Sequence, residues 1–151
     1  MSTQLKSQTE LQAALNRQTA NWSLLYVKLH HYHWYVSGSQ FFTLHAKFEE
    51  LYNEATGYVD ALAERLLAIG GQPASSMTQY LALSELQEAR GGEDAKVMVT
   101  ELVKDFTAVA EELQGVITAA EELRDQPTAD LLIGIRSSVE KHVWMLNAFQ
   151  G

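Results

Sequence analysis

Histidines gather in one short part of this sequence. Four of the five fall within sixteen residues, on both sides of the break Ser37-Gly38-Ser39: His30, His31, His33 and His45. If the break is a turn between antiparallel helices, His33 at the end of the first helix meets His45 near the start of the second. Two facing imidazoles can hold a transition metal.

Carboxylates follow at helical spacing. Glu49 lies four residues after His45, and Asp60 and Glu64 are also four apart, so each pair shares a helix face. On a helical wheel, however, Asp60 and Glu64 point away from the apolar stripe that begins at Leu44. These two acids therefore face away from the core of their own chain.

The helix side that carries the two acids also has small and apolar residues. Thr56, Gly57 and Leu67 lie there, and a glycine inside a helix costs about 1 kcal/mol relative to alanine. Small residues allow another helix to approach closely. We therefore expect a second subunit to pack on this side, so that the acid pair of one chain meets the histidines of the other.

Ordinary structural roles explain each of these residues taken singly. Histidines at a helix end are usually solvated or hydrogen-bonded, which we expect for His30 and His31, and His142 falls in an apolar stripe and is expected in the core. Two acids four apart on a helix commonly form a solvated face. From spacing alone, a metal site and a solvated helix surface both remain open.

Long apolar stripes with helical spacing position these residues. They predict four long helices, with Thr9 as the N-cap of the first, over residues 9–36, 44–69, 99–120 and 131–146. The run Gly70-Gly71-Gln72-Pro73 stops the second helix, and residues 77–83 are expected to form a short helix in the long connection that follows. The expected fold is an all-α four-helix bundle with a crossover between its second and third long helices.

Composition limits the class of protein. The 151 residues, 46% hydrophobic and 20% charged, suit a single globular domain over 1–151 with a short polar tail at 1–8. The absence of cysteine excludes disulfides, thiolate metal sites and cysteine nucleophiles. The net charge of −8 favours cations over phosphate backbones as ligands. We find neither a signal peptide nor an apolar run that could span a bilayer, and we expect a cytoplasmic protein without membrane contact.

A longer pattern resembles one known family. It consists of KLHHYHWYVSGSQFFTLHAKFEELYNE, then VDALAERLLAIGGQP, and finally KHVWMLNAF in the last helix. These motifs resemble the Dps family, the mini-ferritins of the ferritin-like superfamily, over about residues 9–149. The resemblance implies a ferritin-like bundle and a hollow homododecamer. Such a shell oxidises Fe(II), preferably with hydrogen peroxide, and stores the ferric mineral, which protects DNA and the cell from oxidative damage.

The family's ferroxidase site can be carried over residue by residue. Its two histidines match His33 and His45, and an acid nearby matches Glu49. Its acidic pair matches Asp60 and Glu64, contributed by the partner subunit across a two-fold interface. The helical wheel indicates the same sharing between chains. These five residues are the expected iron ligands.

Two features refine this expectation. The sequence has no Glu-x-x-His motif, so a di-iron centre inside a single bundle is not supported. Trp34 follows the first histidine of the site. Its indole would supply an electron when peroxide oxidises too few iron ions, although a packing role explains it equally well. The preferred oxidant in practice and the number of irons per site stay open.

Acidic residues between the third and fourth long helices match the family's pore at one set of three-fold axes. They are Glu121, Glu122, Asp125 and Asp130. Three copies of each acid would concentrate Fe(II) by focusing the electric field. Gln126 stands where relatives often have an acid, which would make the pore less negative. An ordinary solvated turn would also gather such charges.

DNA compaction in the nucleoid is the alternative function. Some family members bind DNA through a lysine-rich N-terminal tail, but residues 1–8 hold only Lys6. Electrostatic binding to DNA needs several cationic side chains. Twelve copies with a net charge of −8 each carry about −96. We therefore expect no appreciable DNA binding. A helical assembly that has lost its enzyme site is a third hypothesis, which the complete ligand set disfavours.

Overall fold

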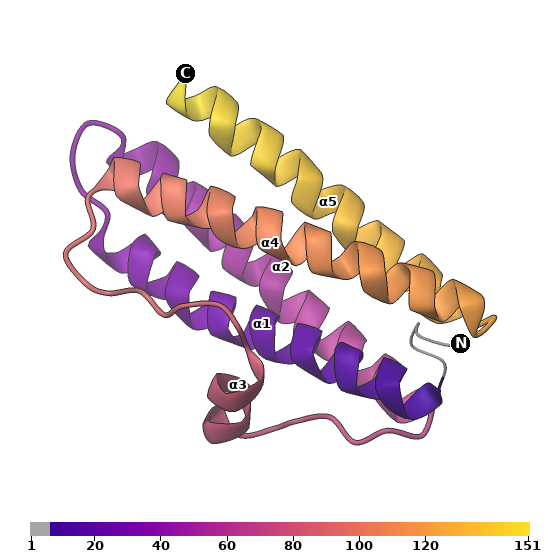
Figure 1. The fold of residues 1–151 in the computed structure, drawn as a ribbon. Coiled ribbons are helices and arrows are strands. Elements are labelled where there is room, and N and C mark those ends of the chain that lie inside the picture. Colours follow the sequence, from indigo (N-terminus) through magenta and orange to yellow (C-terminus); the bar gives the residue numbers. More distant parts are fainter. Residues whose placement is uncertain (1–6) are drawn as a thin grey trace.

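Helices make up the regular structure of the chain. The computed structural model describes residues 7–151, and these contain five helices and no strand: α1 (Gln8–Tyr35), α2 (Phe41–Ala68), α3 (Met77–Leu83), α4 (Ala95–Glu122) and α5 (Gln126–Gln150) (Figure 1). Four of the helices are long, and α3 is the short helix predicted within the connection. The all-α architecture predicted from the apolar stripes is confirmed.

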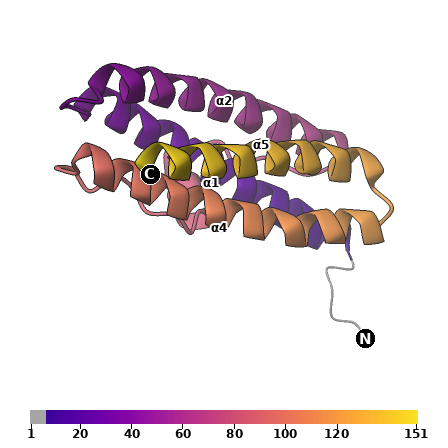
Figure 2. The same ribbon diagram turned by 90° about the horizontal axis from the view of Figure 1, so that it is seen from above.

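The long helices form two antiparallel hairpins. α1 lies beside α2 and α4 beside α5, and the two hairpins pack into one bundle (Figures 1 and 2). The connection over residues 69–94 returns along the bundle to its opposite end, with α3 against the outside of α1. α4 therefore starts at the same end as α2 and runs parallel to it, which is the expected crossover. None of the described helices is long and apolar enough to cross a membrane.

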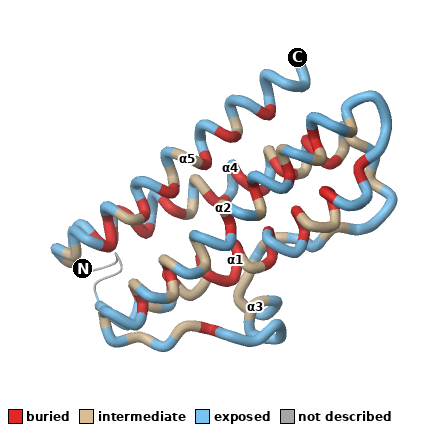
Figure 3. The backbone as a smooth tube through the Cα atoms, turned by 180° about the vertical axis from the view of Figure 1, so that it is seen from behind, coloured by how far each residue is buried: buried red, intermediate tan, exposed pale blue. Residues whose placement is uncertain are grey.

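The apolar stripes face the inside of the bundle. In Figure 3 the buried positions follow the inner side of each long helix and the exposed positions follow the outer side. Leu15, Leu29 and Leu62 have no exposed surface, and the core draws on all four long helices. Burying a side chain of this size contributes about 1.5–3 kcal/mol. This packing holds the end of α1 and the start of α2 in fixed positions.

α1 begins earlier than predicted. Its N-cap is Ser7 and not Thr9, because Ser7 Oγ accepts a hydrogen bond from the Glu10 backbone N–H at 3.1 Å and donates to the Glu10 carboxylate at 3.3 Å. The Ser-x-x-Glu spacing of a capping box favours this start. Of the polar tail predicted over residues 1–8, only Ser7 and Gln8 are described, and both belong to the helix start. Lys6 lies outside the described residues.

A buried ion pair ties α4 and the long connection to α1. Lys28 Nζ lies 2.8 Å from Asp105 Oδ2 and donates a hydrogen bond to the Gln87 carbonyl at 2.7 Å. Lys28 is 2% exposed and Asp105 is 8% exposed. Burial raises the pKa of Asp105, although the hydrogen bond and charge of Lys28 act in the opposite direction. Removing one partner would leave an uncompensated charge inside the bundle.

Candidate metal centre

His33 and His45 lie face to face where α1 ends and α2 begins. Their ring centroids are 3.7 Å apart and their planes differ by 14°. The turn between the helices passes through Gly38, whose φ of 101° is a left-handed conformation that favours glycine. His33 Nδ1 donates to the His45 carbonyl and His45 Nδ1 donates to the His33 carbonyl, each at 2.7 Å. These reciprocal hydrogen bonds link the end of α1 to the start of α2.

The same hydrogen bonds determine which ring nitrogen can bind a metal. A carbonyl oxygen only accepts, so in the neutral form of each ring Nδ1 must carry the hydrogen. The lone pair is then on Nε2. A hydrogen bond from one imidazole nitrogen to a backbone carbonyl is the usual way in which proteins orient a metal-binding histidine. His33 and His45 are therefore held in the tautomer that a metal site requires.

Glu49 and a tyrosine border the histidine pair. His33 Nε2 lies 4.0 Å from Glu49 Oε1, and the Glu49 side chain is 53% exposed. Tyr52 meets His33 edge to face, with ring centroids 5.3 Å apart. Burial, followed by the charge of Glu49, raises the pKa of Tyr52, so the hydroxyl stays protonated at neutral pH. Tyr52 falls within the stretch that resembles the Dps family, but no role was predicted for it from the sequence. Its position one turn after Glu49 was the signal that could have placed it here.

The neighbouring side chains have different surroundings. His30 donates to the backbone carbonyl four residues earlier at 3.0 Å and stacks on Tyr52 with a centroid distance of 3.7 Å. His31 Nε2 lies 3.9 Å from Glu93 Oε1. His30 is thus hydrogen-bonded, as expected, whereas His31 Nε2 is buried without a hydrogen-bond partner among the described residues. Trp34 is 67% exposed, and its ring lies 5.2 Å from His30, so it packs little within its own chain.

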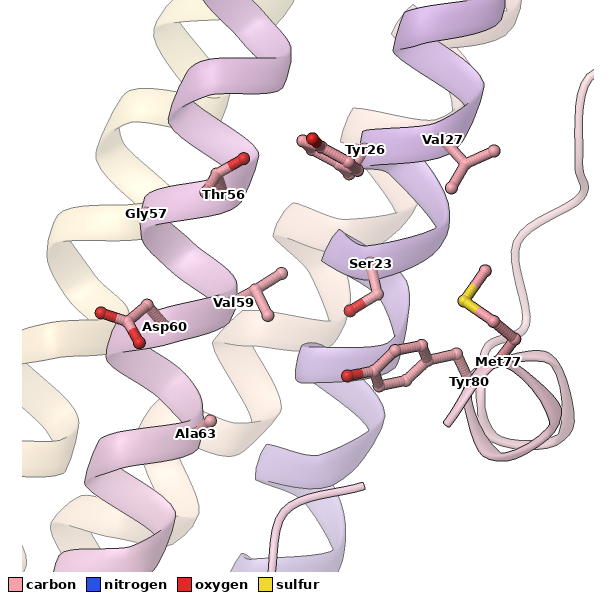
Figure 4. Close-up of a pocket in the computed structure, with 10 residues that line it drawn as sticks. All are labelled: Ser23, Tyr26, Val27, Thr56, Gly57, Val59, Asp60, Ala63, Met77 and Tyr80. Carbon is pink, nitrogen blue, oxygen red and sulfur yellow. The ribbon is translucent and has the colours of Figure 1, made fainter. Parts of the chain in front are cut away.

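Asp60 and Glu64 are both exposed, on the side of α2 that faces away from the core. Asp60 belongs to the lining of a groove of about 600 Å³ between α1, α2 and α3. Figure 4 shows Val59 pointing into this groove and Asp60 on the far side of α2, turned away from α1. A Cβ added at Gly57, which also lines the groove, would meet no atom within 4 Å. This surface is open in the single chain.

The acid pair is remote from the histidine pair within one copy. Asp60 follows Glu49 by eleven positions on the continuous helix α2, which is about 16 Å along its axis at ~1.5 Å per residue. Over residues 7–151, no three His, Asp or Glu side chains come close enough together to hold a metal ion. The chain thus carries the candidate ligands in two separate groups.

The acids predicted at a three-fold pore differ in their surroundings. Three of them are exposed: Glu121, Glu122 and Asp130. The side chain of Asp125, in contrast, is 9% exposed and lies 3.3 Å from Arg65 Nη2. It caps α5 by accepting hydrogen bonds from the backbone N–H of Thr128 at 3.2 Å and its hydroxyl at 2.6 Å. Because the positive charge of Arg65 neutralises the Asp125 carboxylate, Asp125 adds little to the negative potential at this surface.

His142 is buried, as predicted, but it forms part of a polar cluster. Its Nε2 lies 3.0 Å from both carboxylate oxygens of Glu54, and the Ser138 hydroxyl donates to Glu54 at 2.8 Å. Burial alone would raise the pKa of Glu54, but hydrogen bonds from His142, Tyr58 and Ser138 outweigh it and lower that pKa to about 2. Sequence reasoning missed this cluster because Glu54 and His142 are 88 positions apart.

Comparisons with known proteins agree with the fold and the motifs. The family model described as a ferritin-like domain matches residues 12–151. DNA protection during starvation protein 2 of Bacillus anthracis is 52% identical over 135 residues, which cover 89% of this chain and 92% of that protein. The crystal structure of a Dps protein from Bacillus brevis is 50% identical, covers 100% of both chains and has a TM-score of 0.95.

A more distant crystal structure shares the same architecture. This Dps protein from Vibrio cholerae O1, described as a member of a broad superfamily of ferritin-like diiron-carboxylate proteins, is 31% identical over 100% of both chains, with a TM-score of 0.91. Because the family match spans residues 12–151 and Dps proteins reach 50–52% identity, the chain belongs to the Dps family of ferritin-like proteins.

Proposed function

We propose that pairs of subunits bind Fe(II) at shared sites, that hydrogen peroxide oxidises the iron there, and that a shell of twelve copies stores the ferric product. The family supports iron as the metal, since a related Dps protein is described as a ferritin-like diiron-carboxylate protein. The donor set supports it as well, because imidazole and carboxylate suit Fe(II) and leave positions open for an oxidant.

One observation carries the proposal of a shared site. The chain presents two half-sites that cannot meet within one copy, since Glu49 and Asp60 are about 16 Å apart along α2. A two-fold interface brings each half against the complementary half of the partner, and it does so twice. The groove beside Asp60 gives such an interface an apolar surface to cover, including Val27 at 45% exposed and Met77 at 61% exposed.

The residues of the two half-sites have distinct tasks in this reaction. His33 and His45 offer the Nε2 lone pairs that their hydrogen bonds leave free. Glu49 and the partner's Asp60 and Glu64 supply negative charge. Because the metal gains positive charge on oxidation, fixed carboxylates stabilise the ferric product more than Fe(II), which favours electron loss. Each peroxide accepts two electrons and, with two protons, leaves as two water molecules.

Iron access to the shell forms part of the same proposal. The exposed acids Glu121 and Glu122 end α4, and the exposed Asp130 lies near the start of α5. Repeated three times around an axis, they would attract Fe(II) into a pore. Asp125 then has the separate task of holding the turn to Arg65. The net charge of −8 per chain continues to disfavour DNA as a ligand.

Replacement of both site histidines tests the proposal. The His33→Ala/His45→Ala variant should oxidise Fe(II) with peroxide much more slowly than the wild type, because the nitrogen ligands are gone. The measurement is the rate of Fe(III) formation under anaerobic conditions with added peroxide, with particle size measured in parallel. His31→Ala is the matched control and should keep the wild-type rate. Unchanged kinetics in the double variant would overturn the assignment of the histidines.

A second variant separates ligand loss from loss of structure. The reciprocal hydrogen bonds of the histidine rings also fasten α1 to α2, so their removal affects stability as well. Asp60→Asn/Glu64→Gln changes only exposed side chains on α2. It should leave the melting temperature nearly unchanged and still abolish most of the oxidation. Full activity in this variant would contradict the proposed role of the acid pair.

A further inference from the structure

Tyr58 donates a short hydrogen bond to Glu54 inside the bundle. Its hydroxyl lies 2.5 Å from Glu54 Oε2, at the short end of the range for a hydroxyl bonded to a carboxylate. The other donors to this carboxylate are His142 and Ser138. Tyr58 is partly buried and packs against the apolar core. Nothing in the proposed oxidation of iron uses this pair.

We propose that Tyr58 is an internal one-electron donor, and that its phenolic proton passes to Glu54 as its ring is oxidised. Oxidation makes a phenol a strong acid, so the electron leaves readily only where a base can take the proton at once. Glu54 is such a base, already aligned by a hydrogen bond. His142 and Ser138 hold the carboxylate in place while the proton moves.

The charge state of Glu54 agrees with this role. Hydrogen bonds from its three neighbours keep its pKa at about 2 despite burial, so the group is an ionised carboxylate at neutral pH. The Tyr58 hydroxyl donates the hydrogen bond to this carboxylate, which places the proton on the phenol before oxidation. The pair therefore starts as phenol and carboxylate, the combination that the transfer requires.

An aromatic neighbour extends this pair into the core. The Trp22 ring meets Tyr58 edge to face at a centroid distance of 4.7 Å and is 2% exposed. Tyr58 also lies two positions before Asp60 on α2, which is about 3 Å along the helix axis. The two residues share a helical turn but face opposite sides of α2, with the phenol towards the core and Asp60 outwards. The Trp22 ring offers a second aromatic group through which an electron can pass.

The chemical step rests on the proposed function and balances as follows. When peroxide meets a single Fe(II), the iron supplies one electron, and hydroxide and a hydroxyl radical result. The hydroxyl radical takes one electron from Tyr58 and becomes hydroxide, while the phenolic proton moves to Glu54. A later Fe(II) returns an electron to the phenoxyl radical, and Glu54 returns the proton. The sum is two Fe(II) oxidised per peroxide, with no radical released.

An iron-free experiment tests the Tyr58–Glu54 pair independently of any ferroxidase activity. Azidyl radicals made by pulse radiolysis oxidise exposed indoles, of which Trp34 and Trp144 are both 67% exposed. The phenoxyl radical that forms by internal transfer is then followed by its optical absorption and by high-field electron paramagnetic resonance. The wild type should give a phenoxyl signal with the g-shift of a strongly hydrogen-bonded radical. Tyr58→Phe should lose that signal, while the control Tyr80→Phe keeps it.

Glu54→Gln separates the proposed role from mere packing. Gln has the same shape and keeps a hydrogen-bond acceptor but is a far weaker base, so the Tyr58 radical should form at least several-fold more slowly and with a changed g-value. An unaltered signal in Tyr58→Phe, or an unaltered rate and g-value in Glu54→Gln, would overturn the proposal. In the wild type loaded with one Fe(II) per site, excess peroxide should produce the same signal, because no second Fe(II) is present to reduce the radical. Its absence there would overturn the link to iron oxidation.

Discussion

Glu54 should make the stability of the protein depend on pH in acid. The pKa of its carboxyl in the folded chain is about 2, below the unfolded value of about 4.3 for glutamate. A group with a lowered pKa stabilises the fold above its unfolded pKa. That contribution is lost as the pH falls through the folded value. The window in which stability declines is therefore from about pH 4.3 down to about pH 2.

The size of the effect follows from the shift. About two pKa units at ~1.4 kcal/mol each give roughly 3 kcal/mol as the largest contribution of Glu54 at neutral pH. The Glu54 side chain is 26% exposed, so solvent screening reduces this to about 2–3 kcal/mol. The loss is local, because the three donors to the carboxylate lie on α2 and α5.

Urea unfolding of the wild type and Glu54→Gln at several pH values measures this contribution. At pH 7 the variant should be less stable by about 2–3 kcal/mol, and the gap should shrink towards zero near pH 2. Protein concentration is held fixed, because assembly adds to apparent stability. Glu50→Gln is the matched control on the same helix, because the Glu50 side chain is 60% exposed. The difference in free energy of unfolding between wild type and this control should stay below about 0.5 kcal/mol. A gap for Glu54→Gln that is the same at pH 7 and pH 3 would refute the reasoning.

Two further predictions concern the buried ion pair and DNA. Lys28→Met should lower the free energy of unfolding by about 3–5 kcal/mol, because it leaves Asp105 buried and unpaired. The double variant Lys28→Met/Asp105→Leu should recover much of that loss, and urea unfolding that shows the double variant to be no better than the single would contradict this. Plasmid DNA at about 150 mM salt should show no retarded band in a gel once chelator has removed bridging metal ions, since the Debye length is only ~8 Å. A retarded band would reveal a cationic patch that the net charge hides.

The periodicity of apolar residues was sufficient to predict the long helices of the fold. Apolar residues three and four apart mark the inner face of every long helix, and Gly70-Gly71 ends α2 as predicted, with Gly71 N–H bonded to the Leu66 carbonyl at 2.8 Å. The start of α1 was misplaced because Thr9 and Ser7 are both good caps, and only the reciprocal bonds with Glu10 decide between them. Local signals therefore locate the helices well but not their ends: α2, α4 and α5 begin three to five residues before positions 44, 99 and 131, where the apolar stripes start.

The candidate site was only partly predictable from the sequence, because its key contacts join residues that are distant along the chain. The turn at Gly38 made the meeting of His33 and His45 predictable, but the bonds between rings and carbonyls depend on the exact packing of α1 against α2. Arg65 holds Asp125 from 60 positions away, which no turn motif reveals. The pairing of Asp60 with the histidines of another copy lies beyond the contacts of a single chain, so spacing and helix faces could indicate it but not establish it.

Subunit mixing tests the central claim, the site shared between two chains, most directly. One variant lacks His33 and His45, and the other lacks Asp60 and Glu64, so each alone should be nearly inactive in peroxide-driven Fe(II) oxidation. The two variants are unfolded together and reassembled. A mixed two-fold pair has one site with all ligands and one with none. Random pairing makes half of the pairs mixed, so roughly a quarter of the wild-type activity should return. Well-formed mixed shells that recover no activity would show that the four residues do not act across a subunit interface.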